Sequence, residues 1–307
     1  MGLSTNNDLM VPARAGGYAV GAFNTSNLEI TRAIFEAAAE LGSPVIVATS
    51  QSAIKYAGYD NIRCMVENMA ETNGVPASLH LDHGTDPVVI EQCLEHGWTS
   101  IMIDGSHLPF DENIEATKKV VEMCRPRGVS VEGELGRLMG VEDEISVSSD
   151  EAVYTDPKQA VEFVERTGCD SLAIAIGTSH GAYKFKAQPK LAIDRLEQIA
   201  ETVSVPLVLH GASAVPPDVL DLATRYGAEL PGAKGVPPEN IREAIDGGIS
   251  KVNIDTDLRL AFTGRARQFL AESPEVFDPR KILSAAIDGM KDVIRSKIEL
   301  FGSSGKA

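Results

Sequence analysis

Residues 77–104 read ASLHLDHGTDPVVIEQCLEHGWTSIMID, and this stretch decides the fold. A short apolar run, Ala77–Leu81, is followed by a turn, by a helix-period segment at Val88–His96 and by a second apolar run at Ser100–Ile103. Strands this short, joined by one amphipathic helix, are typical of a parallel sheet covered by helices. The stretch therefore predicts one β-α-β unit.

The same alternation continues through the chain. Short β-rich runs occur at Tyr18–Phe23, Pro44–Ala48, Ala77–Leu81, Ser100–Ile103, Val129–Leu135, Ser171–Ile176, Leu207–Leu209 and Lys251–Ile254. Helix-period stretches lie between them at Leu28–Leu41, Asn61–Thr72, Val88–His96, Glu112–Cys124, Pro157–Arg166, Lys190–Glu201 and Pro238–Asp246. Eight strands with intervening helices is the count for a (β/α)8 TIM barrel, whose usual size is about 250 residues. We therefore predict an α/β fold with one catalytic domain over residues 1–307, a long active-site loop after the fifth strand (Gly136–Asp156) and extra C-terminal helices after Asp278.

The composition limits the classes of partner. The chain has 307 residues, with 28 Lys and Arg against 44 Asp and Glu, which gives a formal net charge of −16. A surface this acidic repels phosphate backbones and anionic lipids, so the charge argues against nucleic-acid and membrane partners. It also argues against an anionic small substrate, unless the field at the site differs from the global one.

Sequence features relevant to the compartment agree with one another. Residues 1–12 contain no basic segment followed by an apolar one, so we predict no signal peptide. No apolar run reaches the roughly 18–20 residues that span a bilayer. The four cysteines (Cys64, Cys93, Cys124 and Cys169) are widely spaced and form no CxxC pair, which favours reduced thiols over a disulfide or a metal site. We therefore expect a cytoplasmic protein.

Histidines mark the ends of three predicted strands. In such barrels the residues just after the C-terminal ends of the strands face the active site. Three of the six histidines, His83, His180 and His210, occupy such positions on three different strands. Three imidazoles with an open fourth position are the ligand set of a catalytic zinc or a similar metal. We expect His80, within a strand, and His96, at a helix end, to be structural.

Asp82 lies directly before His83. It is either a partner that orients a metal ligand or a general acid–base beside the metal. Adjacent residues on a strand point in opposite directions, so the two can share a ligand only where the strand has ended. We expect Gly84 to permit that turn.

Other carboxylates belong to the neighbouring strands. Glu132 and Glu134 share one face of the fifth strand, and such a pair inside a barrel needs a cation or a proton between its members. Asp104 follows the fourth strand. Asp104 and Glu134 are candidate alternate metal ligands, and a core network with Arg137 is the other interpretation.

Glycine-rich turns at residues 177–181 and 211–213 follow the sixth and seventh strands. Small residues there let backbone N–H groups approach a ligand, as in phosphate sites. With residues 253–256, which open a helix after the eighth strand, they match the phosphate position of such barrels. Lys184 either adds a cation or is a solvated loop lysine. The segment Gly136–Asp156, which contains Glu142, is either a lid or a solvated acidic loop.

These motifs together resemble the class II, metal-dependent fructose-1,6-bisphosphate aldolases. The resemblance extends from GAFN at 21–24 to DPRK at 278–281, and its motifs are LHLDHG at 79–84, ELG at 134–136, GTSHG at 177–181, LHGAS at 209–213 and KVNIDT at 251–256. It implies a (β/α)8 barrel that reversibly cleaves D-fructose 1,6-bisphosphate to dihydroxyacetone phosphate and D-glyceraldehyde 3-phosphate. That reaction, part of glycolysis and gluconeogenesis, passes through a metal-stabilised enediolate.

The resemblance also implies a role for each candidate residue. Zinc would be held by His83, His180 and His210, and Asp104 and Glu134 match positions that hold the metal when it retracts inward. Asp82 falls on the catalytic aspartate, and Glu142 matches the lid glutamate that moves the substrate proton. The substrate-binding candidates are Asn24, Ser50, Gly181, Lys184, Gly211, Ser213, Asn253, Asp255, Thr256 and Arg259.

Further expectations concern the partners of the site. We expect a second or alternate divalent position and a monovalent cation near the phosphate. The resemblance implies a homodimer or homotetramer, in which Arg259 reaches the second phosphate from a neighbouring subunit.

Several other functions compete with this prediction. Within the same family, the alternative is a tagatose-1,6-bisphosphate aldolase. A Schiff-base aldolase would use Lys184 or Lys251, and a non-enzymatic phosphosugar-binding module would need neither metal nor lid carboxylate. A barrel metallohydrolase normally carries a His-x-His pair on its first strand, which residues 18–24 lack.

Overall fold

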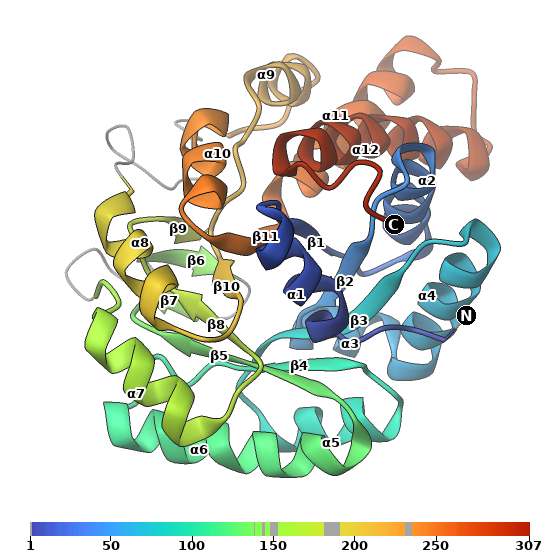
Figure 1. The fold of residues 1–307 in the computed structure, drawn as a ribbon. Helices are drawn as coiled ribbons and strands as arrows, with labels where there is room; N and C mark the ends of the chain where they lie inside the picture. The colour runs from blue at the N-terminus through green and yellow to red at the C-terminus, as the bar shows by residue number, and fades with distance from the viewer. Residues whose placement is uncertain (1, 138, 143–144, 148–152, 181–190, 231–234) are drawn as a thin grey trace.

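The computed structural model describes residues 2–137, 139–142, 145–147, 153–180, 191–230 and 235–307; for 139–142, 145–147 and 180 only the backbone is described. Eight parallel strands, hydrogen-bonded in the order β1-β11-β10-β8-β5-β4-β3-β2, close into a barrel surrounded by helices (Figure 1). The predicted α/β fold, a (β/α)8 TIM barrel, is therefore confirmed.

The elements lie close to the predicted runs. The barrel strands are β1 (Val20–Asn24), β2 (Val45–Thr49), β3 (Ala77–Gly84), β4 (Ser100–Ile103), β5 (Ser130–Leu135), β8 (Ser171–Ile174), β10 (Leu207–Leu209) and β11 (Ile249–Ile254). The helices are α1 (Asn6–Gly16), α2 (Leu28–Leu41), α3 (Gln51–Ala57), α4 (Tyr59–Asn73), α5 (Pro87–Glu95), α6 (Phe110–Cys124), α7 (Pro157–Thr167), α8 (Ile193–Thr202), α9 (Pro217–Arg225), α10 (Pro238–Asp246), α11 (Thr256–Glu272) and α12 (Pro279–Phe301), with a short 3-10 turn at Arg125–Arg127.

The barrel strands separate polar from apolar side chains by alternation. In β3, Leu79 and Leu81 belong to the apolar core shared with the surrounding helices, whereas His80 and Asp82 are buried inside the barrel. Successive side chains of a strand point to opposite faces, so a period of two residues is enough to produce this separation. Among the described residues, the buried polar side chains of the barrel interior include Asn24, Ser78, His80, Asp82, Ser100, Asp104, Ser130, Glu132, Glu134, His210, Lys251 and Asn253.

Helix α1 lies across the end of the barrel where the strands begin (Figure 1). A capping box formed by Thr5 and Asp8 starts the helix. Met10 and Ala13 are fully buried in one cluster with inward-facing strand residues such as Val20 and Val208. The helix therefore closes this end with an apolar face.

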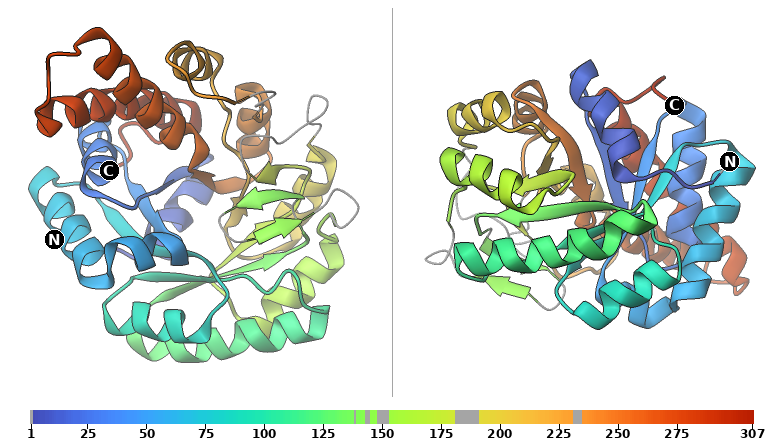
Figure 2. Two further views of the ribbon diagram at one scale, coloured as in Figure 1. Left: turned by 180° about the vertical axis from the view of Figure 1, so that it is seen from behind. Right: turned by 60° about the horizontal axis from the view of Figure 1, so that its bottom comes forward.

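The segment after β5, predicted as a long loop, contains strands. β6 (Met139–Glu142) pairs antiparallel with β7 (Ile145–Val147) and parallel with β9 (Ser179–His180). This small sheet and α1 lie at opposite ends of the barrel (Figures 1 and 2). The long connection predicted after the fifth strand therefore contains two short strands of its own, while 143–144 and 148–152 lie outside the described residues.

Two features bear on the predicted compartment. All four cysteines are free thiols; Cys64 is exposed and the other three are buried. Within the described part of the chain, no helix combines the length and the apolar character needed to cross a membrane.

Truncating the buried face of α1 tests its contribution to stability. Replacing Met10 with Ala should lower the free energy of unfolding by about 2–5 kcal/mol, because a fully buried side chain leaves a cavity. Urea denaturation followed by circular dichroism measures this change. The control is Val11→Ala on the exposed side of the same helix, which should change stability by less than about 0.5 kcal/mol; equal effects would show that α1 is not packed as described.

Candidate active site

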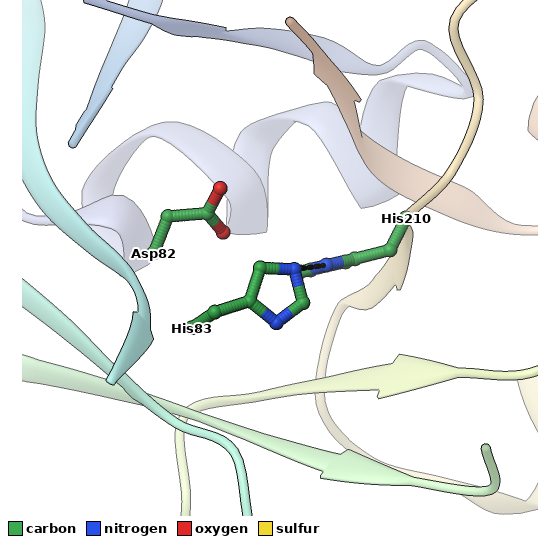
Figure 3. A group of neighbouring side chains, drawn as sticks. All are labelled: Asp82, His83 and His210. Carbon is green, nitrogen blue, oxygen red and sulfur yellow. Dashed lines mark hydrogen bonds between the residues drawn. The ribbon is translucent and has the colours of Figure 1, made fainter. Parts of the chain in front are cut away.

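Two of the predicted histidines converge where the strands end. His83 comes from the end of β3 and His210 follows β10, and His210 Nδ1 lies 3.0 Å from His83 Nε2 (Figure 3). The two rings are nearly perpendicular, with centroids 4.7 Å apart. At this separation one nitrogen can donate to the other, or both can bind a single ion at the usual metal–nitrogen distance of about 2.0–2.1 Å.

The opposite nitrogen of each ring faces a carboxylate. His83 Nδ1 lies 3.3 Å from Asp104 Oδ2 and 3.8 Å from Glu134 Oε2. His210 Nε2 lies 2.9 Å from Glu132 Oε1. Metal-binding histidines almost always donate their second N–H to a carboxylate, a carbonyl or water, which orients the ring and sets its tautomer. These residues therefore fit a divalent cation between His83 Nε2 and His210 Nδ1.

The protonation of the site suits metal binding. Burial lowers the pKa of His210 below its ordinary value, against the opposing effect of the hydrogen bond to Glu132. Burial alone would raise the pKa of Asp104, but the interaction with His83 and the hydrogen bonds from Ser106 hold it well below its usual range. Metal ligands must be neutral imidazoles and ionised carboxylates, and these shifts favour both states near neutral pH.

The backbone turns at His83 itself. Its φ is 49°, a left-handed value that few non-glycine residues adopt. The pairing of β3 with β4 is irregular at this point, so Asp82 and His83 face one region although they are neighbours. The prediction that Gly84 permits the turn is wrong. A Cβ atom at Gly84 would lie 2.5 Å from the Met102 carbonyl oxygen, so glycine is needed there for close strand packing.

Two amides hold Asp82. Asn24 Nδ2 donates to Asp82 Oδ2 and Asn253 Nδ2 donates to Asp82 Oδ1, each at 3.0 Å. Asp82 is 1% exposed, and one ligand atom from each of Asp82, His83 and His210 lies within 4.8 Å of the others. The carboxylate therefore has a fixed position beside both imidazoles.

The same two amides present unused acceptors. Asn24 Oδ1 and Asn253 Oδ1 are buried, and neither has a hydrogen-bond partner within the described part of the chain. Buried acceptors without partners are rare and cost free energy. A ligand that donates hydroxyl groups would satisfy them.

The third predicted histidine, His180, is the last residue of β9, and its side chain lies outside what the structure describes. Gly211 lies against this strand. Its φ is 61°, and a Cβ atom there would lie 2.7 Å from the Ser179 carbonyl oxygen. The fold therefore packs the backbone of Ser179, the residue before His180, against the loop that begins at His210.

Asp257 and Lys297 hold the loop after β10, and neither was predicted from the sequence. Asp257 accepts N–H groups from Ala214 at 3.0 Å and from Val215 at 2.8 Å. Lys297 Nζ lies 2.8 Å from the same carboxylate, and both side chains are buried. Val215 has a φ of 48°, so this anchoring stabilises a strained loop. A lysine within the apolar stripe of α12 was the signal that could have indicated it.

The other candidate residues surround the same end of the barrel. Ser50 is the N-cap residue of α3, and Thr256 is the first residue of α11. Asp255 accepts from Arg259 Nε at 2.8 Å, and its backbone N–H donates to Ser213 Oγ at 3.5 Å. Gly181 and Lys184 lie outside the described residues, and Glu142 is described by its backbone alone, in β6.

His80 and His96, which we expected to be structural, form hydrogen-bond contacts with other side chains of the protein. His80 Nδ1 lies 3.0 Å from Ser100 Oγ, and burial lowers the pKa of His80 to about 3. His96 Nδ1 lies 2.8 Å from Asp60 Oδ1. Lys251, considered above as a Schiff-base lysine, is completely buried and forms an ion pair with Glu132 at 2.7 Å.

Known proteins share this sequence and fold. A sequence profile described as fructose-bisphosphate aldolase class-II matches residues 4–306. The chain belongs to this family. A fructose-bisphosphate aldolase of Thermus caldophilus is 50% identical over 305 residues, covering 99% of this chain and 100% of the relative. One from Helicobacter pylori (strain ATCC 700392 / 26695) is 48% identical over 305 residues, covering 99% of each. The crystal structure of the YdjI aldolase of Escherichia coli K12 superposes with a TM-score of 0.80 at 34% identity, covering 99% of both chains.

Class II aldolases depend on a divalent metal, and the chain has side chains that could hold one. Among the described residues, two groups bring ligand atoms within 4.8 Å of one another: Asp82, His83 and His210, and His83, Asp104 and Glu134. Both groups contain His83. The candidate metal ligands whose side chains the structure describes therefore form one continuous cluster.

Removing one converging imidazole tests this cluster. His210→Ala should weaken zinc binding by more than the roughly 10–100-fold that loss of a group behind a ligand costs. Competition against a chromogenic chelator measures the dissociation constant. His96→Ala, which removes a histidine paired with Asp60 elsewhere, is the control and should bind zinc like the parent; equal affinity in both variants would contradict the site.

Proposed function

We propose that the whole chain, residues 1–307, is one catalytic domain that reversibly cleaves D-fructose 1,6-bisphosphate to dihydroxyacetone phosphate and D-glyceraldehyde 3-phosphate. The observation that carries the proposal is the approach of His83 Nε2 to His210 Nδ1, at 3.0 Å, with a carboxylate behind each ring. Membership of the class II family and the names of the relatives support the substrate.

We infer that the metal is zinc and that His83, His180 and His210 hold it, because imidazole nitrogens are ligands that suit zinc. The bound ion supplies a Lewis acid that polarises the ketose carbonyl. Asp104 and Glu134, on the other side of His83, form the alternate or second divalent position. We also propose that a monovalent cation binds near the substrate phosphate.

Asp82 is the proposed base for cleavage. It takes the proton of the C4 hydroxyl as the C3–C4 bond breaks, which releases the aldehyde product and leaves the bonding electron pair on C3. Both carboxylate oxygens are fixed by amide donors, and this orientation suits a proton acceptor. Asn24 Oδ1 and Asn253 Oδ1 are acceptors for substrate hydroxyl groups.

Glu142 is the proposed acid that completes cleavage. It delivers a proton to C3, which gives dihydroxyacetone phosphate, and condensation reverses both transfers. Its place in β6, a strand paired with β9, supports this role, since β9 ends at His180. The proton donor and a proposed metal ligand thus lie on adjacent strands.

We propose that one substrate phosphate binds at the ends of β9, β10 and β11. Gly181, Lys184, Gly211, Ser213, Asn253, Asp255 and Thr256 are the residues proposed to bind this end of the substrate, and Ser50 contributes from the β2 end. The anchored loop after β10 and the first turn of α11 support this assignment, because backbone N–H groups at a helix start attract anions.

Arg259 is proposed to bind the second phosphate across a subunit boundary in a homodimer or homotetramer. Its side chain is 59% exposed, and it pairs with Asp255 of its own chain at 2.7 Å. The free thiols support a cytoplasmic location. At the site, local cations and N–H groups offset the repulsion between the net charge of −16 and a phosphorylated sugar. The same net charge argues against nucleic acid and membrane as partners.

The competing activities have less support. The family profile and the relatives are named for fructose bisphosphate, so tagatose bisphosphate is not favoured. For Lys251, a Schiff base would require a neutral, accessible amine, whereas its ammonium is fully buried against Glu132.

A coupled cleavage assay distinguishes these activities. With fructose 1,6-bisphosphate the enzyme should produce both triose phosphates, and a chelator should abolish turnover until divalent metal is restored. Borohydride with substrate should leave activity intact, since no imine forms. Faster cleavage of tagatose bisphosphate, or chelator-resistant activity with borohydride inactivation, would contradict the proposal.

Replacing the proposed base separates its role from metal binding. Asp82→Ala should lower kcat by about 10²–10⁴-fold, because proton transfer by a positioned side chain contributes that much, while bound zinc stays stoichiometric. Asp111→Ala, an exposed carboxylate on α6, is the control and should keep full activity. Loss of zinc from Asp82→Ala would instead make Asp82 a residue that holds the metal site together.

A further inference from the structure

Lys251 is a buried lysine that the proposed reaction does not use. It lies in the middle of β11, with its side chain inside the barrel and completely buried. Its Nζ atom lies 2.7 Å from Glu132 Oε2 and 3.2 Å from His80 Nε2. Burying an ammonium is costly unless it is paired, so its presence requires an explanation.

The ion pair continues to the metal cluster. One oxygen of Glu132 contacts Lys251, and the other lies 2.9 Å from His210 Nε2. The contact with Lys251 joins two groups without exposed surface at 2.7 Å, which is the geometry of an ion pair. The carboxylate therefore joins the lysine to the proposed ligand.

The chemistry of Lys251 and Glu132 fixes which atoms donate and which accept along this chain of contacts. An ammonium can only donate, so Glu132 Oε2 accepts from Lys251. Glu132 can only accept, so His210 carries its proton on Nε2. The lone pair of His210 Nδ1 is left facing His83.

Few groups near Glu132 could take the place of Lys251 as its hydrogen-bond donor and counter-charge. Lys251, Glu132 and His80 are all fully buried, and α1 covers the near end of the barrel with its apolar face. On the same helix, Asn6 Nδ2 lies 3.2 Å from His80 Nδ1, and Asn6 Oδ1 accepts from Ser78 Oγ. The polar side chain that α1 brings to this depth is therefore already hydrogen-bonded to other groups.

We propose that Lys251 is a positioning residue of the metal site. Its ammonium holds the Glu132 carboxylate, which fixes the tautomer and ring orientation of His210 so that Nδ1 points at the ion. The inference rests on the proposed function only for the existence of that ion. It assigns Lys251 no contact with substrate.

Three variants test the assignment: Lys251→Met, Glu132→Gln and the double variant. For each metal-free protein, competition with a chromogenic chelator gives the zinc dissociation constant, and the visible spectrum of the cobalt-loaded form reports ligand geometry. Lys251→Met should weaken zinc binding about 10–100-fold and alter the cobalt spectrum, as loss of a group behind a ligand does. Glu132→Gln should also weaken binding, because the amide has one oxygen where Lys251 and His210 Nε2 each need an acceptor.

The double variant is the decisive measurement. The amide that replaces the Glu132 carboxylate can still accept from His210 Nε2 through its oxygen, and no buried charge remains. The double variant should therefore bind zinc more tightly than either single variant and regain the parent cobalt spectrum. A lysine that served only as packing would give additive losses. Additive losses, or a Lys251→Met protein with parental affinity and spectrum, would overturn the proposal.

Two controls keep the outcome interpretable. Lys291→Met removes another lysine paired with carboxylates, Glu36 and Glu40, away from the barrel interior, and should leave zinc affinity unchanged. If Lys251→Met does not fold, the double variant must still bind more tightly than Glu132→Gln alone, and equal or weaker binding overturns the proposal. A parent protein that binds no divalent ion would refute the proposed function itself, a result distinct from failure of the variants.

Discussion

The negative charge of a buried carboxylate must be balanced by neighbouring groups. Inside the barrel, Lys251 and His210 are placed so that they balance the charge of Glu132. Glu132 has no exposed surface, and it is flanked by Lys251 at 2.7 Å and by His210 at 2.9 Å. The lysine balances its charge, and the imidazole N–H occupies its second oxygen. That second contact sets which nitrogen of His210 faces His83, so the metal cluster depends on an ion pair one layer below it.

The two ends of the barrel have different physical characters. At the end where the strands begin, α1 and inward-facing apolar residues exclude water. At the other end the strands present Asp82, His83 and His210, and the anchored loop after β10 and the first turn of α11 follow. The net charge of −16 therefore limits the partners of the outer surface. It does not describe this end, where the proposed function places a metal, Arg259 and backbone donors.

The helices and strands that were predicted correctly are those with a regular local spacing of apolar residues. Helices α2 and α10 and strands β4 and β10 match their predicted ranges, because their apolar spacing is regular. Helix α1 was missed, since Pro12 interrupts a segment rich in small residues, and the pairing of β6 with β9 joins segments far apart in the chain. Asp82, His83 and His210 were predicted from their places after strands. The contact of Lys251 with Glu132 spans 119 positions and depends on barrel closure, which one sequence does not encode locally.

The most direct test of this account is the position of the ion. Crystals of the zinc-loaded protein, measured above and below the zinc absorption edge, locate the metal by anomalous scattering without assumptions about chemistry. We expect one strong peak between His83 Nε2 and His210 Nδ1, at about 2.0–2.1 Å from each nitrogen. Zinc bound elsewhere, or to His83 with His210 turned away from it, would contradict metal binding by the two converging imidazoles.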